Sequence, residues 1–99
     1  MPQVMRIGDK ANGNCAIHGS TTVTMTKAGQ STVYADGILV CVVGAEGVGD
    51  CGDHTVATTG SPNVFAEGKS IHRVTDKGVF DIVGGDYVAK SGSPNVNAN

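Results

Sequence analysis

The sequence predicts a small all-β protein made of short hairpins that repeat around a common axis. Valine and threonine, with 14 and 9 residues, far outnumber leucine, which occurs only as Leu39. β-Branched side chains lose rotamer freedom in a helix and pack well on a pleated sheet. The 15 glycines would interrupt most helices longer than two turns. A turn sequence that recurs along the chain is the third observation, because repeated hairpins can bury one another's apolar faces.

Size and charge narrow the class of protein. A chain of 99 residues and 10.0 kDa predicts a single domain over residues 1–99. With two phenylalanines, two tyrosines and no tryptophan, the core is small, so a metal, a disulfide or a partner is expected to stabilise it. The odd number of cysteines, three, disfavours a disulfide framework. The net charge of −2 and the scattered basic residues exclude a nucleic-acid-binding surface.

The repeated segment is a turn that leads into a strand. Residues 60–64, Gly-Ser-Pro-Asn-Val, recur as residues 92–96, and residues 29–33 form a degenerate copy, Gly-Gln-Ser-Thr-Val. Proline fixes φ, and asparagine and glycine tolerate left-handed backbone, so this segment predicts a turn. The first two copies continue as Val-aromatic-Ala, which predicts a short strand.

Each short strand is followed by an acid and a glycine, which predict a hairpin turn and a return strand. These pairs are Asp36-Gly37 and Glu67-Gly68, the return strands cover residues 38–43 and 70–74, and residues 44–54 and 75–80 are expected as loops. The third unit ends at Asn99 before its return strand, and residues 4–7 are expected to supply it. In this arrangement glycines form the turns and valines form the inner faces of three hairpins, which predicts a compact, triangular body.

Three cysteines and three histidines carry the metal-binding chemistry. They are Cys15, His18, Cys41, Cys51, His54 and His72. Cys15 with His18 and Cys51 with His54 form two Cys-x-x-His pairs, and the repeat aligns Cys41 with His72. Thiolate and imidazole are preferred ligands of tetrahedral zinc. A structural zinc near the repeat axis would stabilise a core this small, because its binding energy becomes folding energy.

Other interpretations of these residues remain open. Cys41 lies in an apolar run and suits a buried thiol, Cys15 suits a surface thiol, and His72 suits a surface position beside an arginine. Cys51 could also form a catalytic triad with a histidine and an aspartate, either His54 or His72 with Asp53 or Asp76. A glycine-rich loop gives such a triad no fixed orientation, and the sequence shows no oxyanion-hole element, so an enzyme is not expected. The carboxylates lie mainly at predicted turns and are expected to be solvated.

The longest repeat copy resembles the signature of the PAAR-repeat family. The match covers residues 60–76, Gly-Ser-Pro-Asn-Val-Phe-Ala-Glu-Gly-Lys-Ser-Ile-His-Arg-Val-Thr-Asp, and residues 6–9, Arg-Ile-Gly-Asp, resemble the end of another such unit. Residues 92–96 resemble the closing copy, so the resemblance extends over nearly the whole chain. The departures are Ser70 for the usual proline, Glu67 for asparagine and Thr75 for glycine, and the first copy lacks proline and arginine.

The resemblance implies a conical, three-faced tip of short hairpins with a zinc ion near its vertex, held by three histidines and one cysteine. The ligand set carried over is His18, Cys51, His54 and His72, with Cys41 as the second choice of thiolate and Cys15 as the third. Iron is the alternative metal, because the same donors accept it. No catalytic residue is implied.

The resemblance also implies a structural function without enzymatic activity. Such a tip caps the trimeric β-helical spike of a contractile injection machine, in a phage tail or a type VI secretion system, and helps to pierce the target cell's outer membrane. The expected partner is a phage spike protein or a valine-glycine repeat protein, bound by one copy of this chain. The N-terminal residues lack a signal-peptide apolar stretch, so synthesis in the cytoplasm and a final place at a virion tail tip or in a secreted spike are expected. The alternatives are a free-standing zinc-binding β adaptor module and, less favoured, a small thiol enzyme.

Overall fold

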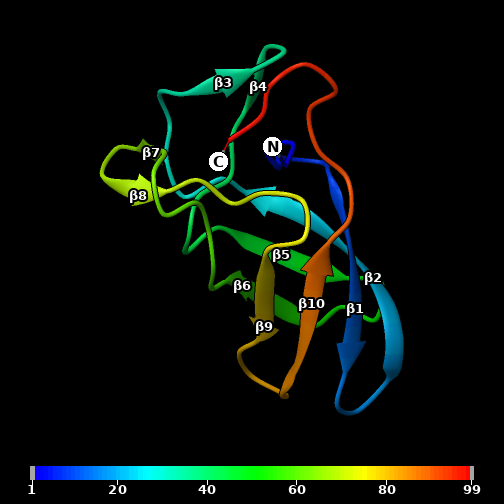
Figure 1. Cartoon of the computed structure of the whole chain (residues 1–99). Coiled ribbons are helices and arrows are strands. Elements are labelled where there is room, and N and C mark those ends of the chain that lie inside the picture. Colours follow the sequence, from blue (N-terminus) through cyan, green and yellow to red (C-terminus); the bar gives the residue numbers. More distant parts are fainter. Residues whose placement is uncertain (1, 99) are drawn as a thin grey trace.

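The computed structural model describes residues 2–98, and its regular structure is entirely β (Figure 1). The strands are β1 (Lys10–Cys15), β2 (Gly19–Lys27), β3 (Tyr34–Ala35), β4 (Ile38–Leu39), β5 (Glu46–Gly49), β6 (His54–Ala57), β7 (Phe65–Ala66), β8 (Lys69–Ser70), β9 (Lys77–Phe80) and β10 (Gly85–Ala89). The body measures 33 × 23 × 21 Å. The prediction of a small conical all-β body of pseudo-threefold hairpins is confirmed. In the described part of the chain we find no helix that could span a membrane.

Six strands close into an antiparallel barrel in the order β1-β10-β9-β6-β5-β2. Three consecutive hairpins build it, namely β1–β2, β5–β6 and β9–β10. Residues 44–54 and 75–80 were expected as loops, but they contain three pieces of the barrel: β5, the first residue of β6, and β9. That expectation is wrong because the inward positions of these strands carry glycine, which resembles a turn signal in the sequence.

Two aromatic rings fill the barrel, and glycines on other barrel strands make room for them. Tyr87 and Phe80 are buried, with 1% and 2% of their surface exposed. A Cβ atom at Gly78 would overlap the Tyr87 ring, and one at Gly13 would lie 3.1 Å from the Phe80 ring. Valines instead occupy outward positions of several barrel strands. Val79, for example, is 38% exposed. In the short repeat hairpins, for which inward valines were expected, Val4, Val40 and Val42 are buried in one apolar cluster.

The hairpins β3–β4 and β7–β8 lie beyond one end of the barrel and follow the predicted turn chemistry (Figure 1). Asp36 and Gly37 have φ values of 55° and 77°, and Glu67 and Gly68 have φ values of 51° and 77°. Positive φ at both central residues defines the turn that suits a two-residue hairpin. The predicted hairpin turns are therefore confirmed.

The N-terminal segment completes the third unit. Gln3 pairs with Asn97, and the Val4 N–H donates to the Val96 carbonyl at 3.0 Å. The same bond recurs in the other two units, from Val40 to Val33 at 3.0 Å and from Ile71 to Val64 at 3.1 Å. The expected return strand is thus supplied from the N-terminus, and its pairing begins at Gln3 rather than at residue 4. We use the name hairpin end for this part of the molecule, formed by β3–β4, β7–β8 and residues 2–4 with 96–98.

A closed ring of three backbone hydrogen bonds joins the hairpin end to the barrel. The Met5 N–H donates to His72 O at 2.9 Å, the Cys41 N–H to Met5 O at 2.8 Å, and the His72 N–H to Cys41 O at 2.9 Å. All three residues are fully buried. The pseudo-threefold axis therefore passes through this ring and along the barrel. The opposite end of the barrel, formed by residues 16–18, 50–53 and 81–84, is named the turn end.

Candidate metal centre

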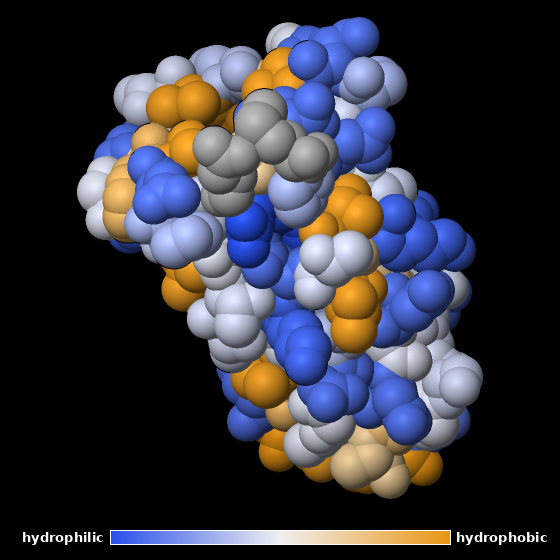
Figure 2. Space-filling view, viewed as in Figure 1, coloured by the Kyte–Doolittle hydropathy of each residue, from blue (hydrophilic) through white to orange (hydrophobic). Residues whose placement is uncertain are grey.

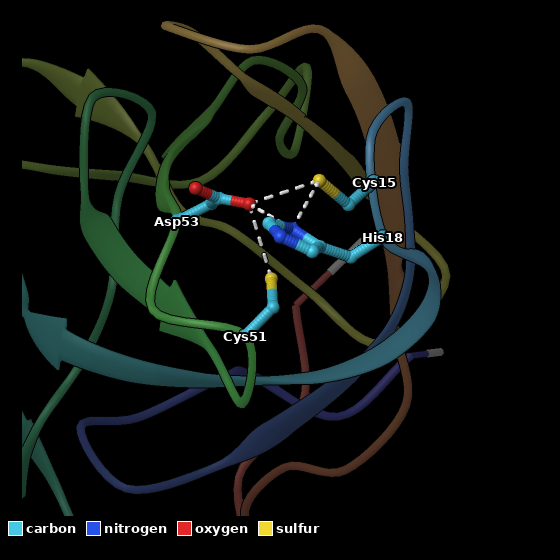
Figure 3. A group of neighbouring side chains, drawn as sticks. All are labelled: Cys15, His18, Cys51 and Asp53. Atoms are coloured by element: carbon cyan, nitrogen blue, oxygen red, sulfur yellow. Dashed lines mark hydrogen bonds and ion pairs between the residues drawn. The ribbon is translucent and has the colours of Figure 1, made fainter.

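Four side chains that can bind a metal converge at the turn end. They are Cys15, His18, Cys51 and Asp53, and their ligand atoms all lie within 4.8 Å of one another (Figure 3). Two neighbouring hairpins supply them. Because β2 pairs with β5, with Val23 opposite Gly49, the β1–β2 turn and the β5–β6 loop lie side by side.

Local backbone geometry directs each side chain to this point. Cys15 is the last residue of β1 and lies on its buried face, whereas His18 follows in the turn before β2. In the β5–β6 loop, the Gly49 N–H donates to the Asp53 carbonyl at 2.9 Å and the Gly52 N–H to the Gly49 carbonyl at 2.8 Å. Gly52 has a φ of 90°, a conformation that L side chains rarely adopt. This tight loop places Cys51 and Asp53 together.

One carboxylate oxygen contacts the other three groups. Asp53 Oδ2 accepts from the Cys15 thiol at 3.0 Å and from the Cys51 thiol at 3.2 Å, and it lies 2.8 Å from His18 Nδ1. Cys15 Sγ lies 3.6 Å from the same histidine nitrogen. Cys15 is buried and the His18 side chain is 48% exposed, so the group opens to solvent on the histidine side.

Hydrogen bonding shifts the pKa values of two of these groups in opposite directions. The thiols of Cys15 and Cys51 donate to Asp53 and lower the pKa of its carboxyl. The hydrogen bond to Asp53, together with burial, raises the pKa of the Cys15 thiol. The two thiol protons thus hold the Asp53 carboxylate close to both sulfurs. A bound metal cation would take the place of those protons.

The donor set fits a tetrahedral metal site. Two thiolates, an imidazole and a carboxylate are all zinc ligands, and their bond lengths place the ligand atoms of a tetrahedral site about 3.3–3.8 Å apart. The Cys15–His18 separation of 3.6 Å falls in this range, and the three contacts to Asp53, at 2.8–3.2 Å, are a few tenths of an ångström shorter. Cys51 Sγ lies within 4.8 Å of the Cys15 and His18 ligand atoms, so an outward shift of the carboxylate and a small inward movement of the Cys51 loop would complete the site.

His54 was predicted as a ligand, but the structure places it outside this group. It begins β6, in which buried and half-buried residues alternate, so it and Thr55 face opposite sides of the sheet. On the outer side, His54 Nε2 lies 2.8 Å from Glu46 Oε1 and its Nδ1 lies 2.7 Å from Asp81 Oδ1. The hydrogen bonds to Glu46 and Asp81 raise the pKa of His54. This histidine cross-links the outer face of the barrel.

His72 lies near the opposite end of the barrel, in the buried ring that joins the hairpin end. Its Nδ1 lies 2.7 Å from the Thr59 carbonyl and its Nε2 lies 3.1 Å from the Tyr87 hydroxyl, which fixes the tautomer with the proton on Nδ1. Burial lowers the pKa of His72. Cys41, the second choice of thiolate, belongs to the same ring, and burial raises the pKa of Cys41 to about 12.

Of the four predicted ligands, the structure therefore brings together His18 and Cys51, and adds Cys15 and Asp53. Cys15 was the third choice of thiolate, and its Cys-x-x-His pair with His18 was visible in the sequence. Asp53 had been considered as a solvated turn residue and as a member of a triad. In the sequence, the one indication that Asp53 is a ligand is its position two residues after Cys51. That indication is weak, because aspartate is common in turns.

The surface around the turn end is mixed in character (Figure 2). Ile17 and Ile82, in two of its turns, are 67% and 79% exposed. A shallow depression lies beside the metal-binding group, and its lining is small or polar: Asn12, Gly13, Ser20, Thr21, Thr22 and Asp50. No protein-family model matches the chain, and no curated protein matches it either.

Proposed function

We propose that the chain is a metal-stapled structural tip that caps the trimeric β-helical spike of a contractile injection machine. The observation that carries the proposal is the placement of a four-ligand metal group at one end of a pseudo-threefold body. The resemblance to the PAAR-repeat family, visible in the turn and Arg-x-x-Asp segments, supplies the identity of the machine. In this proposal the turn end leads and the hairpin end contacts the spike.

Zinc is the metal that we assign to the turn end, held by Cys15, His18, Cys51 and Asp53. A structural zinc supplies four strong bonds at fixed angles. Here the four residues would join the β1–β2 turn to the β5–β6 loop at the turn end of the barrel. Iron is the alternative, because the same donors accept it.

The hairpin end offers a surface of matching symmetry to a trimeric partner. Tyr34 and Phe65 occupy the same repeat position and are 58% and 55% exposed, and the third position is Asn97. Figure 2 shows apolar surface over this part of the molecule. Exposed aromatic side chains and the edges of two-stranded sheets are features that protein partners bind. We assign them to contact with the blunt end of the spike.

The proposed action is mechanical. Contraction of the sheath supplies the work, and the tip supplies a stiff, narrow body that enters the outer membrane of the target cell. Tight hairpins, a filled barrel and a metal cross-link all limit backbone motion. No chemical step is assigned to the cysteines, and we propose no enzymatic activity.

Binding to the spike tests this function directly. The chain would be co-expressed with the trimeric β-helical spike protein encoded in the same genome, and the complex examined by native mass spectrometry. We expect one copy of this chain per spike trimer, and a Tyr34→Ala/Phe65→Ala variant should bind at least tenfold more weakly. A stable, zinc-bound monomer that does not bind the spike at about 10 µM would overturn the proposal and favour the free-standing adaptor module.

A further inference from the structure

The two cysteines of the turn end lie close enough to react with each other. Cys15 and Cys51 are 36 positions apart in the sequence, yet their Sγ atoms lie within 4.8 Å. Both thiols donate to the same oxygen atom, Asp53 Oδ2, and Figure 3 shows both sulfurs directed toward that carboxylate. A short movement of the loop that carries Cys51 would bring the sulfurs into bonding distance.

The third cysteine does not compete for this reaction. Cys41 lies in the buried ring near the far end of the barrel and has no exposed surface. Burial also raises the pKa of the Cys41 thiol to about 12, which lowers its fraction of reactive thiolate. Proximity therefore favours the pairing of Cys15 with Cys51.

We propose that Cys15 and Cys51 form a disulfide bond when the site holds no metal and the protein meets a disulfide oxidant. The metal-bound half of this proposal rests on the metal centre of the proposed function, whereas the disulfide itself does not. The same two loops would then be joined by a metal in a reducing compartment and by a covalent bond in an oxidising one. The odd cysteine count disfavoured this pairing in the sequence, and only the fold brings the two thiols together.

The chemistry is a two-step exchange with a small disulfide such as oxidised glutathione. Cys51, the more accessible thiol, loses its proton to water and attacks one sulfur of glutathione disulfide, whose S–S bond breaks and releases one glutathione thiolate. Cys15 then loses its proton to water and attacks the mixed disulfide at Cys51, which releases the second glutathione. The two cysteine thiols are oxidised by two electrons, and one glutathione disulfide is reduced to two glutathione thiols, which take up the two protons.

A bound metal should protect Cys15 and Cys51 from oxidation, because the electron pairs of their thiolates are then engaged in metal–sulfur bonds. The covalent bond should also raise stability, since it closes a long loop between two hairpins. For a domain of this size we expect the oxidised, metal-free protein to melt about 10 °C above the reduced, metal-free protein.

The test uses the full chain, reduced and stripped of metal, and then incubated with oxidised glutathione. We expect two of three thiols to disappear, a mass lower by about 2 Da, and a Cys15–Cys51 cross-linked peptide after digestion. Cys41→Ser should behave like the wild type, whereas Cys51→Ser should form no intramolecular disulfide. Three persistent free thiols, or a stable glutathione adduct on Cys51, would overturn the proposal. Wild-type peptide mapping decides the pairing even where a cysteine variant fails to fold.

Zinc binding is measured separately, by titration of zinc chloride into the reduced protein. His18→Ala should bind zinc at least tenfold more weakly and still form the disulfide. A protein that binds no zinc but forms the disulfide would refute the metal centre and leave this inference standing. A protein that binds zinc but never forms the disulfide would refute this inference and leave the metal centre standing.

Discussion

The hairpin end and the turn end hold their backbone in different ways. At the hairpin end, each turn is held by a side chain of its own repeat: the Ser61 hydroxyl accepts from Asn63 and Val64, and the Ser93 hydroxyl accepts from Asn95 and Val96. In the degenerate copy, the Gln30 side chain makes the same pair of contacts.

The turn end relies on contacts between segments that are distant in the sequence. Cys15 and Asp53, for example, are 38 positions apart, and their hydrogen bond exists because two barrel hairpins pair. Local turn chemistry thus shapes each repeat of the hairpin end, where Asp36 and Glu67 also bond to neighbouring repeats. Barrel closure determines the turn end. The difference predicts that the barrel tolerates changes in side-chain volume poorly, whereas the hairpin end is sensitive to backbone conformation.

Gly78→Ala should give the largest effect. The new methyl group would overlap the buried Tyr87 ring, and we expect a loss of about 3 kcal/mol in the free energy of unfolding, measured by urea denaturation. Gly37→Ala at the hairpin end is the matched control: no atom lies within 4 Å of the added carbon, but φ is 77°. It should cost about 1 kcal/mol. Equal losses would contradict the distinction between the barrel and the hairpin end.

Zinc should stabilise the protein through the turn end. At a free zinc concentration about 100-fold above the dissociation constant, the melting temperature should rise by about 10 °C. His18→Gln should abolish most of this rise, whereas His54→Gln, one of the four ligands predicted from the sequence, should keep it, because His54 faces Glu46 and Asp81. Differential scanning fluorimetry with and without a chelator gives the measurement. Loss of the rise in both variants would favour the sequence-predicted ligand set, which contains His18 and His54.

Acid should weaken the junction between the two ends through His72. Burial lowers the pKa of His72 in the folded protein, so its neutral form contributes stability that is fully present above about pH 6.5. This contribution is lost as the pH falls through the lowered pKa, at no more than about 1.4 kcal/mol per pH unit. His72→Met copies Met5, its repeat mate, and removes this titration. As the pH falls from 7.5 to 5, we expect the free energy of unfolding of the variant to increase relative to that of the wild type. Parallel pH profiles would contradict this assignment.

Thr75→Gly should give the smallest effect, with the opposite sign. Thr75 has a φ of 80°, whereas the residues at the equivalent repeat positions, Gly8 and Gly44, have φ values of 88° and 96°. A β-branched residue is strained in this region, and its exposed side chain contributes little packing. The variant should unfold at a higher urea concentration, with a gain of about 0.5 kcal/mol. The reverse change, Gly44→Thr, should destabilise.

The candidate metal centre shows where sequence reasoning stops. The Cys-x-x-His pair of Cys15 and His18 is local, and the turn between two strands keeps its members together. The second pair, Cys51 with His54, is separated because a strand begins at His54 and turns its side chain outward. Strand alternation depends on where β6 starts, and glycines in the inward positions of β5 hide that boundary in the sequence.

By itself, the sequence determined the all-β class, the repeat, the hairpin turns at Asp36-Gly37 and Glu67-Gly68, and the completion of the third unit by the N-terminal segment. These features depend on the backbone preferences of neighbouring residues, and the same preferences recur in each repeat copy. Only the tertiary structure decided that three further hairpins close into a barrel and that Asp53 joins Cys15. Both outcomes depend on pairing between β2 and β5, which lie in different hairpins, and on two aromatic rings that fill the space left by glycines. No local sequence preference encodes such contacts, because each contact depends on how two distant segments pack against each other.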